Sequence, residues 1–167
     1  MKTIRPVILF ILLLIPSFSF AQTHHVGTYV SPGLQFGFCF SGGWFLGLQV
    51  TAGNTYDILF GEEEYVESDK ANFIDAEGVT LGHRWYFRSK LKSMTYLDYQ
   101  VSTQNYIAGG GMGVAIIRSK ANQNNPELAG RVKGWAGSLG LLTSDLTLMK
   151  KSANLNMGLM AVAPIPN

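Results

Sequence analysis

The segment Trp44-Phe-Leu-Gly-Leu-Gln-Val-Thr-Ala-Gly-Asn-Thr-Tyr-Asp-Ile-Leu-Phe60 decides the fold class of this chain. Its apolar and aromatic residues recur at every second position, with one interruption at Asn54, and residues 47, 49, 51, 53, 55 and 57 between them are small or polar. A β-strand places alternate side chains on opposite faces, whereas no helix could collect these residues on one side. The segment is therefore predicted to be a long two-faced strand.

The same alternation continues on both sides of this segment. Upstream, residues 34–40 alternate in the same way, and Ser41-Gly42-Gly43 is predicted to join the two runs as a tight hairpin turn. Downstream, the clear alternating runs are 79–87, 97–101 and 155–161. No convincing helical period appears after residue 21, so the rest of the chain is predicted to be all-β.

Two segments show a weaker pattern. Residues 106–118 contain several glycines and have little contrast between their two faces. In residues 129–149 the apolar parity changes near Leu141-Leu142, which suggests a bulge or bend within one strand.

These runs predict an antiparallel up-and-down meander barrel of about eight strands. Eight strands require breaks at Ser31-Pro32-Gly33 and near residues 103–105. Residues 26–36 keep one parity across the first break, so a single long strand is also credible, and closing both breaks leaves six long strands. The eight expected strands cover residues 24–30, 34–41, 44–60, 77–88, 93–102, 106–118, 129–149 and 153–163.

Residues 1–21 have the ordered features of a secretory signal peptide. Lys2 and Arg5 precede an apolar run, and Ser19 and Ala21 occupy the −3 and −1 positions of a cleavage site. The apolar run is shorter than the ~20 residues that a membrane-spanning helix needs. The expected organisation is therefore a signal peptide followed by one domain, the β-barrel of residues 22–167.

The net charge of the chain belongs to the signal peptide. The whole sequence has a formal net charge of +2, and removal of Lys2 and Arg5 would leave equal numbers of basic and acidic residues. Because nucleic-acid binding depends on a positive charge that neutralises phosphates, no nucleic-acid partner is expected. The single cysteine also excludes a disulfide framework.

Alternation alone does not tell which way the apolar face points. A soluble sandwich or a lipocalin-like barrel would bury that face, whereas a membrane barrel would turn it toward lipid. Charged residues make up only 14% of the chain, against roughly 25% in soluble domains. The polar face consists mostly of Gly, Ser, Thr, Gln and Asn, which suits a narrow, crowded lumen better than a water-exposed surface. We therefore expect the apolar face to meet lipid.

The alternating runs, such as 33–38 and 44–51, make the chain resemble the small outer-membrane β-barrel proteins of Gram-negative bacteria. The resemblance implies an outer-membrane location, contact with membrane lipid or lipopolysaccharide, and recognition by the barrel-assembly machinery. It also implies a structural, adhesive or interaction role and not a general pore. The C-terminus, Ala163-Pro-Ile-Pro-Asn167, departs from this pattern, because such proteins often end on an aromatic residue that the assembly machinery reads.

An acidic segment, residues 62–76, separates two of the expected strands. With a periplasmic N-terminus, the strand count above places this segment outside the cell and Arg88–Lys92 inside. We expect a solvated loop that could present its carboxylates to a protein partner or to divalent ions, although it lacks the regular oxygen spacing of a calcium loop. Its acidic residues before the next strand are Glu62, Glu63, Glu64, Glu67, Asp69 and Asp75.

Four charged residues stand on or near the polar faces, where they could pair inside the lumen: Arg84, Asp98, Arg131 and Asp145.

His83 lies instead on the apolar face. Some small outer-membrane barrels that trim lipid A carry a His/Ser/acid site on their lipid-facing surface, so His83, with Ser89 and Glu77 near it in sequence, is a catalytic candidate. We expect an interfacial histidine, no enzyme activity and no cofactor.

His24 would become the third residue after cleavage, a spacing that lets a free amine, two amides and an imidazole chelate Cu(II) or Ni(II). An N-terminal Gln22 usually cyclises and removes that amine, so no metal site is predicted.

The alternative to the membrane barrel is a secreted or periplasmic soluble barrel that binds a small apolar ligand. It is favoured by Gly42-Gly43-Trp44 and Asp98-Tyr99, which resemble short lipocalin motifs.

Overall fold

The protein is described by a computed structural model covering residues 22–59, 76–102, 108–121, 125–137, 141–163 and 165–166. Within these ranges the chain forms antiparallel strands. The same ranges contain no helix long and apolar enough to cross a membrane. The strands are β1 (Gln22–Cys39), β2 (Trp44–Leu59), β3 (Ala76–Phe87), β4 (Leu91–Ser102), β5 (Ala108–Ser119), β6 (Glu127–Ala136), β7 (Leu141–Leu148), β8 (Ala153–Val162) and the short β9 (Ile165–Pro166).

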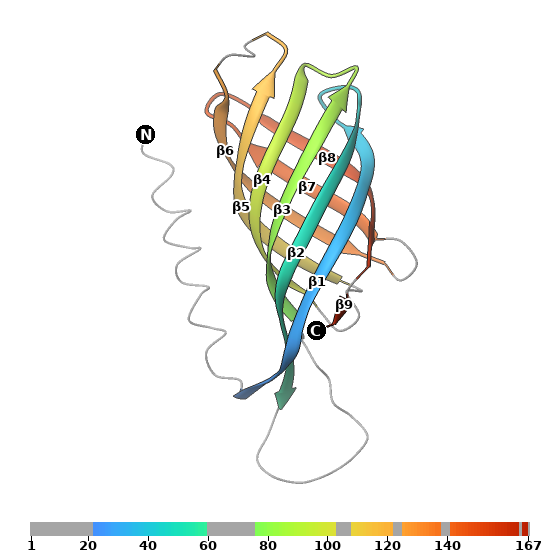
Figure 1. The fold of residues 1–167 in the computed structure, drawn as a ribbon. Coiled ribbons are helices and arrows are strands. Elements are labelled where there is room, and N and C mark those ends of the chain that lie inside the picture. Colours follow the sequence, from blue (N-terminus) through green and yellow to red (C-terminus); the bar gives the residue numbers. More distant parts are fainter. Residues whose placement is uncertain are drawn as a thin grey trace.

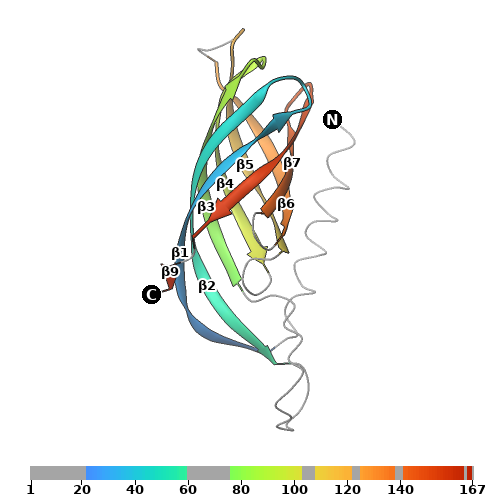
Figure 2. The ribbon, with the colours of Figure 1, turned by 90° about the vertical axis from the view of Figure 1, so that its right-hand side faces the viewer.

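The first eight strands close into an up-and-down barrel (Figures 1 and 2). Each of them pairs antiparallel with its neighbour in the chain, and β8 pairs back with β1 from Gly33–Val162 to Cys39–Asn156. β9 adds two further pairs to β1. The predicted all-β, eight-stranded meander is confirmed.

The predicted break at residues 31–33 is wrong, because β1 continues through it without interruption. Pro32 is tolerated there because it lies beside the gap between β8, which ends opposite Gly33, and β9, which begins opposite Val30. The carbonyl of Pro32 accepts a hydrogen bond from the N–H of Ala163, 3.0 Å away. The N–H that proline lacks would point to this same side, where the ladder is interrupted.

The eighth strand comes instead from residues 129–149, which form the two strands β6 and β7. The parity change near Leu141 therefore marks a connection between strands, not a bulge inside one. Gly137, just after β6, has a φ of 140°, which an L side chain rarely adopts. The predicted division near residues 103–105 agrees with the observed ends of β4 and β5, at Ser102 and Ala108.

Continuity of β1 changes the end at which the acidic segment is attached. β2 runs back beside β1 and ends at Leu59, opposite Gln22. The chain therefore leaves β2 and enters β3 at the end of the barrel where β1 begins, called here the terminal end. The predicted placement at the opposite end is wrong. Glu62, Glu63, Glu64, Glu67, Asp69 and Asp75 themselves lie outside the described residues.

The opposite end, called here the turn end, carries the connections after β1, β3, β5 and β7 (Figure 1). These connections lie between Cys39 and Trp44, Phe87 and Leu91, Ser119 and Glu127, and Leu148 and Ala153. The predicted position of Arg88–Lys92 at the N-terminal end is corrected in the same way, because the turn after β3 lies at the turn end.

Along most of the strands, side chains alternate between the interior and the outer wall. On β7, for example, Leu141, Thr143, Asp145 and Thr147 are buried and the residues between them are exposed. Most outward positions are apolar, and every one of the eight long strands contributes to this apolar surface, whereas a soluble protein mostly exposes polar residues and buries apolar ones. Exposed examples, one per strand, are Leu34, Leu46, Leu81, Leu97, Val114, Val132, Leu142 and Leu159.

The interior has an apolar part and a charged part. Near the turn end, buried apolar residues pack together: Cys39, Phe45, Tyr86, Leu91, Met94, Tyr96, Ala115, Ile117 and Ala129. Tyr96 fits only because Gly82 faces it from β3, where a Cβ atom would lie 2.2 Å from the ring carbon Cζ. The middle of the barrel holds the charged residues described next.

Candidate functional site

Five buried charged side chains form a network across the lumen. Arg84 Nη1 lies 2.5 Å from Asp145 Oδ2, and Nη2 of Arg131 lies 3.4 Å from the same oxygen. Arg131 also pairs with Asp98 Oδ2, from which Lys133 Nζ lies 3.4 Å away. The network joins β3, β4, β6 and β7, so it connects opposite walls of the barrel.

Neutral acceptors contribute to the balance of charge, since three cations share two carboxylates. Arg84 Nε donates to Gln35 Oε1 at 2.7 Å, and Lys133 Nζ donates to Gln100 Oε1 at 2.7 Å. The guanidinium of Arg131 stacks over the Tyr96 ring, with its carbon 3.9 Å from the centroid. Buried charges are tolerated when they are paired and hydrogen-bonded in this way.

Asp145 has a second polar contact on its other oxygen. Asn156 Nδ2 donates to Oδ1 of Asp145 at 2.9 Å, and Asn154 Nδ2 donates to Asn156 Oδ1 at 3.0 Å. From Asn154 the chain of contacts reaches the Cys39 thiol, whose sulfur lies 3.0 Å from Asn154 Oδ1. Cys39 is therefore a buried thiol inside the barrel near the turn end.

The structure places Arg84, Asp98, Arg131 and Asp145 in the interior and brings all four into one network. Lys133 belongs to the same network but was not predicted from the sequence. The signal was present, because Lys133 stands two residues after Arg131 and therefore on the same face of β6. The face of Lys133 could not be assigned from the sequence, because the parity of apolar residues changes within 129–149, which the structure divides into β6 and β7.

The charged interior is a packed structure in which the carboxylates already have cationic partners. Among the described residues, no group of three or more His, Cys, Asp or Glu side chains could hold a metal ion. The backbone of His24 lies in β1, and its side chain lies outside the described part of the chain.

His83 lies on the outer wall, with Nδ1 2.8 Å from Oγ1 of Thr95 and its ring centroid 4.6 Å from that of Trp85. Ser89 is buried at the turn end, where its Oγ accepts from the N–H of Leu91. Glu77 lies six residues from His83 along β3, about 20 Å in an extended strand, and accepts a hydrogen bond from the Tyr99 hydroxyl. The structure thus brings His83 to Thr95 and not to Ser89 or Glu77.

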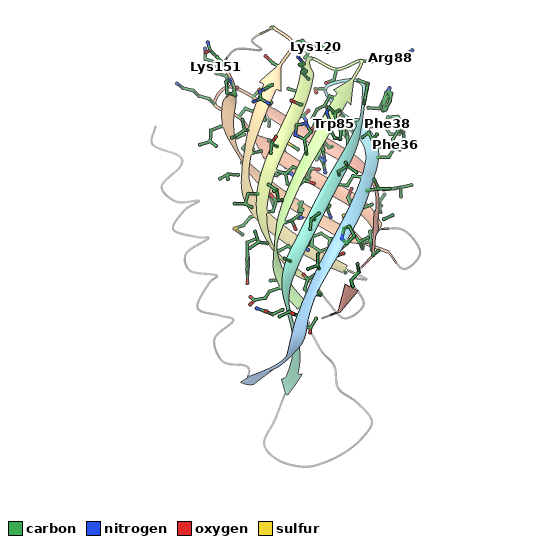
Figure 3. All side chains as sticks on the ribbon, viewed as in Figure 1. Phe36, Phe38, Trp85, Arg88, Lys120 and Lys151 are labelled. Carbon is green, nitrogen blue, oxygen red and sulfur yellow. The ribbon has the colours of Figure 1, made fainter. Side chains whose placement is uncertain are left out.

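The turn end gathers basic residues that are dispersed in the sequence. Arg88, Lys120 and Lys151 project there in Figure 3, above the aromatic residues Phe36, Phe38 and Trp85 on the outer wall. The exposed basic residues of this end are Arg88, Lys90, Lys92, Arg118, Lys120, Lys150 and Lys151. In the sequence these residues form three separate short runs, 88–92, 118–120 and 150–151, which the strand topology brings to one end of the barrel.

Comparisons of the chain with protein-family models, with curated proteins and with solved structures find no match. Inference about function therefore depends on the polarity of the barrel and on the residues at its two ends.

Proposed function

We propose that this protein is a small outer-membrane β-barrel of Gram-negative bacteria with a structural, adhesive or interaction role. The observation that supports the proposal is the inverted polarity of the barrel. Charged side chains are buried inside, and large apolar side chains are exposed around the outer wall. A soluble monomer rarely exposes an apolar patch larger than a few hundred Å², and here every long strand contributes to one.

The strand lengths agree with a membrane location. A transmembrane strand needs about 9–11 residues; seven of the eight long strands contain 10 to 18 residues, and β7 contains 8. Lipid on the outside and paired charges on the inside would satisfy both faces of each strand. Side chains fill the lumen and ion pairs cross it, which supports a role other than that of a general pore.

The soluble lipocalin-like barrel is the second candidate, and the geometry favours it less. An apolar ligand needs an apolar cavity, but ion pairs between β3 and β7 cross the middle of this lumen. Trp44, the residue of the short lipocalin-like motif, points outward and stacks on Phe87 with ring centroids 4.1 Å apart.

A lipid-modifying enzyme is the third candidate. It would need partners for His83 other than Ser89 and Glu77, because His83 contacts Thr95 and neither of those residues.

The orientation follows from the cost of carrying each end across the hydrocarbon core. The terminal end holds the N-terminus of the barrel and both attachment points of the acidic segment. The turn end has only short connections, the longest running from Ser119 to Glu127. Both ends carry charged residues, but a long acidic segment is more expensive to move through lipid than short turns are. We therefore assign the turn end to the outer leaflet and the terminal end to the periplasm. The acidic segment then presents its carboxylates to a periplasmic partner.

Membrane fractionation combined with heat-modifiability tests the proposal. The full-length protein, expressed with its signal peptide in a Gram-negative host, should remain in the outer-membrane fraction after carbonate washing. It should also migrate differently on a detergent gel before and after boiling, because folded barrels resist the detergent. Recovery in the soluble periplasmic fraction, with one unchanged gel position, would overturn the proposal and favour the lipocalin-like barrel.

A further inference from the structure

The described part of the lumen holds one positive charge in excess. Its buried cations are Arg84, Arg131 and Lys133, and its buried carboxylates are Asp98 and Asp145. Lys133 has a single carboxylate contact, from Nζ to Asp98 Oδ2 at 3.4 Å, and that carboxylate lies closer to Arg131. Neutral acceptors lower the cost of a buried cation but do not cancel its charge. Among the described side chains, Lys133 is therefore the lumen cation that the carboxylates neutralise least.

The Lys133 side chain crosses the neighbouring strand β5 over a glycine. Gly111 is paired with Lys133 on one side and with Gln100 on the other. A Cβ atom at Gly111 would lie 3.1 Å from Cε of Lys133, so the lysine lies directly over this glycine. Nζ donates to Gln100 Oε1 at 2.7 Å, whereas Thr80 Oγ1 is 3.5 Å away. Because an ammonium has three hydrogens to donate and its other contacts are long, it can still donate strongly to a closer acceptor.

Trp135 repeats this arrangement one inward position nearer the terminal end. Gly109 is paired with Trp135 on one side and with Ser102 on the other. A Cβ atom at Gly109 would lie 2.6 Å from the indole carbon Cε2, which is bonded to Nε1, so the indole lies over this glycine. Trp135 and Ser102 are both buried, and neither the indole Nε1 nor the serine Oγ has a hydrogen-bond partner among the described residues. Since an indole N–H can only donate, it requires an acceptor.

These groups lie in one part of the lumen, on the side of β4, β5 and β6, which are neighbours in the barrel (Figure 1). Lys133 Nζ is 5.3 Å from the centroid of the Trp135 ring. Ser102 is the last residue of β4 and Trp135 the last but one of β6, so both stand close to the terminal end. Lys133 Nζ, Trp135 Nε1 and Ser102 Oγ are called here the lumen donors. The glycines that weaken the sequence pattern of residues 106–118 leave space for them.

We propose that the lumen binds one singly charged anion, a halide or a small carboxylate, among the lumen donors. One negative charge would balance the excess positive charge, and the same anion would accept from the indole N–H and the hydroxyl. A water molecule could accept these hydrogen bonds but would leave the excess charge in place. The inference goes beyond the proposed function and does not depend on what covers the outer wall, because the site lies inside the barrel.

Trp135 provides the measurement, because it is the interior one of the three tryptophans in the chain. The variant Trp44→Phe, Trp85→Phe, refolded in detergent micelles, retains Trp135 alone. Sodium bromide quenches an indole that its anion touches, and sodium sulfate keeps the ionic strength constant. We expect quenching that rises to a plateau and is reversed by sodium formate or sodium chloride. Stronger reversal by formate would identify a carboxylate site, and stronger reversal by chloride a halide site.

Variants in this single-tryptophan background assign the plateau to the lumen donors. Lys133→Met should abolish the plateau and still fold, because it leaves two cations for two carboxylates. Ser102→Ala should weaken bromide binding roughly ten-fold, as expected for the loss of a hydrogen bond to a charged group. Thr143→Val is the matched control. Thr143 is paired with Trp135, but its hydroxyl already donates to the carbonyl of Gly158 at 3.3 Å, so bromide binding should be unchanged. An unchanged circular dichroism spectrum shows that each variant is folded.

Two outcomes would overturn the inference. Quenching that rises linearly with bromide and is equal in Lys133→Met would show random collisions with the indole and no anion site. Absence of quenching would show that bromide does not reach the lumen donors. Either result would leave the proposed function in place, since membrane fractionation and heat-modifiability test the outer wall and not the lumen.

Discussion

Arg84 on β3 and Asp145 on β7 meet in the centre of the lumen, with Nη1 2.5 Å from Oδ2, although their strands lie on opposite sides of the barrel. Hydrogen-bonded strand pairs connect only neighbours, so this ion pair is a direct tie between facing walls. Arg131 and Asn156 also contact the same carboxylate. Asp145 therefore holds together groups from three strands other than its own.

Removal of this carboxylate should strongly destabilise the barrel. Asp145→Asn would leave Arg84 and Arg131 without their shared anion, and loss of one partner from a buried ion pair costs roughly 3–5 kcal/mol. Urea unfolding in lipid vesicles, followed by tryptophan fluorescence, measures this free energy. Ser144→Asn, on the outward face next to Asp145, should change it by less than about 1 kcal/mol. A double variant, Arg84→Gln with Asp145→Asn, should recover part of the loss, and a purely additive result would contradict the direct tie.

Gly82 should tolerate no side chain, because Tyr96 occupies its space. In Gly82→Val the new Cβ would meet the Tyr96 ring at 2.2 Å, and that ring also supports the Arg131 guanidinium. Overpacking of this kind costs roughly 1–3 kcal/mol, which the same unfolding experiment would detect. Gly130→Val is the matched control, since nothing lies within 4 Å of its added Cβ. Equal stability of the two variants would contradict the packing described here.

Arginine on the outer wall should be costly in proportion to its depth in the membrane. Leu97 lies near the middle of β4, whereas Leu128 is the second residue of β6, near the turn end. Leu97→Arg should lower the unfolding free energy in vesicles by about 2–4 kcal/mol, and Leu128→Arg by about 0–1 kcal/mol. A water-exposed wall would tolerate both substitutions alike, so equal small effects would contradict the membrane location.

The Cys39 thiol should be protected in the folded barrel. Its sulfur lies among Ser41, Asn154 and the interior apolar residues, and the residue is buried. Maleimide labelling should be roughly ten-fold or more slower in the folded than in the unfolded protein, because labelling requires local opening. Lys120→Cys in a Cys39→Ser background should label rapidly in both states. Rapid labelling of Cys39 in folded protein would contradict its interior position.

The period of two predicts most of the strands because it depends only on local alternation, whereas glycine-rich β5 shows little contrast between its two faces. Strand ends depend on tertiary pairing, which alternation does not encode. Pro32 looks like a break in sequence, yet it is accommodated because β8 stops opposite Gly33 and leaves a gap beside it. Predicting a break in β1 at residues 31–33 adds one strand before the acidic segment and so places that segment at the wrong end of the barrel.

The interior network was only partly predictable for the same reason. Parity indicates that Arg84 and Asp145 face the polar side, but not that they meet. Their contact requires the strand count, the registers of the closed barrel and the space that glycines such as Gly82 leave for Tyr96. The gathering of basic residues at the turn end likewise depends on which connections between strands lie at the same end of the barrel.

The β1–β2 hairpin continues past the point where the barrel closes, as Figure 2 shows. Residues Gln22–His25 pair with Tyr56–Leu59, whereas the pairs of β8 and β9 with β1 begin at Tyr29 and those of β3 with β2 begin at Thr55. An isolated two-stranded ribbon is only marginally stable in water, so amide hydrogens of this extension should exchange with solvent well before those of Gly33–Cys39 on the same strand. The strand β1 thus holds both backbone that is paired on two sides and a stretch that opens easily, and the chain runs into the acidic segment from the β2 half of the same extension.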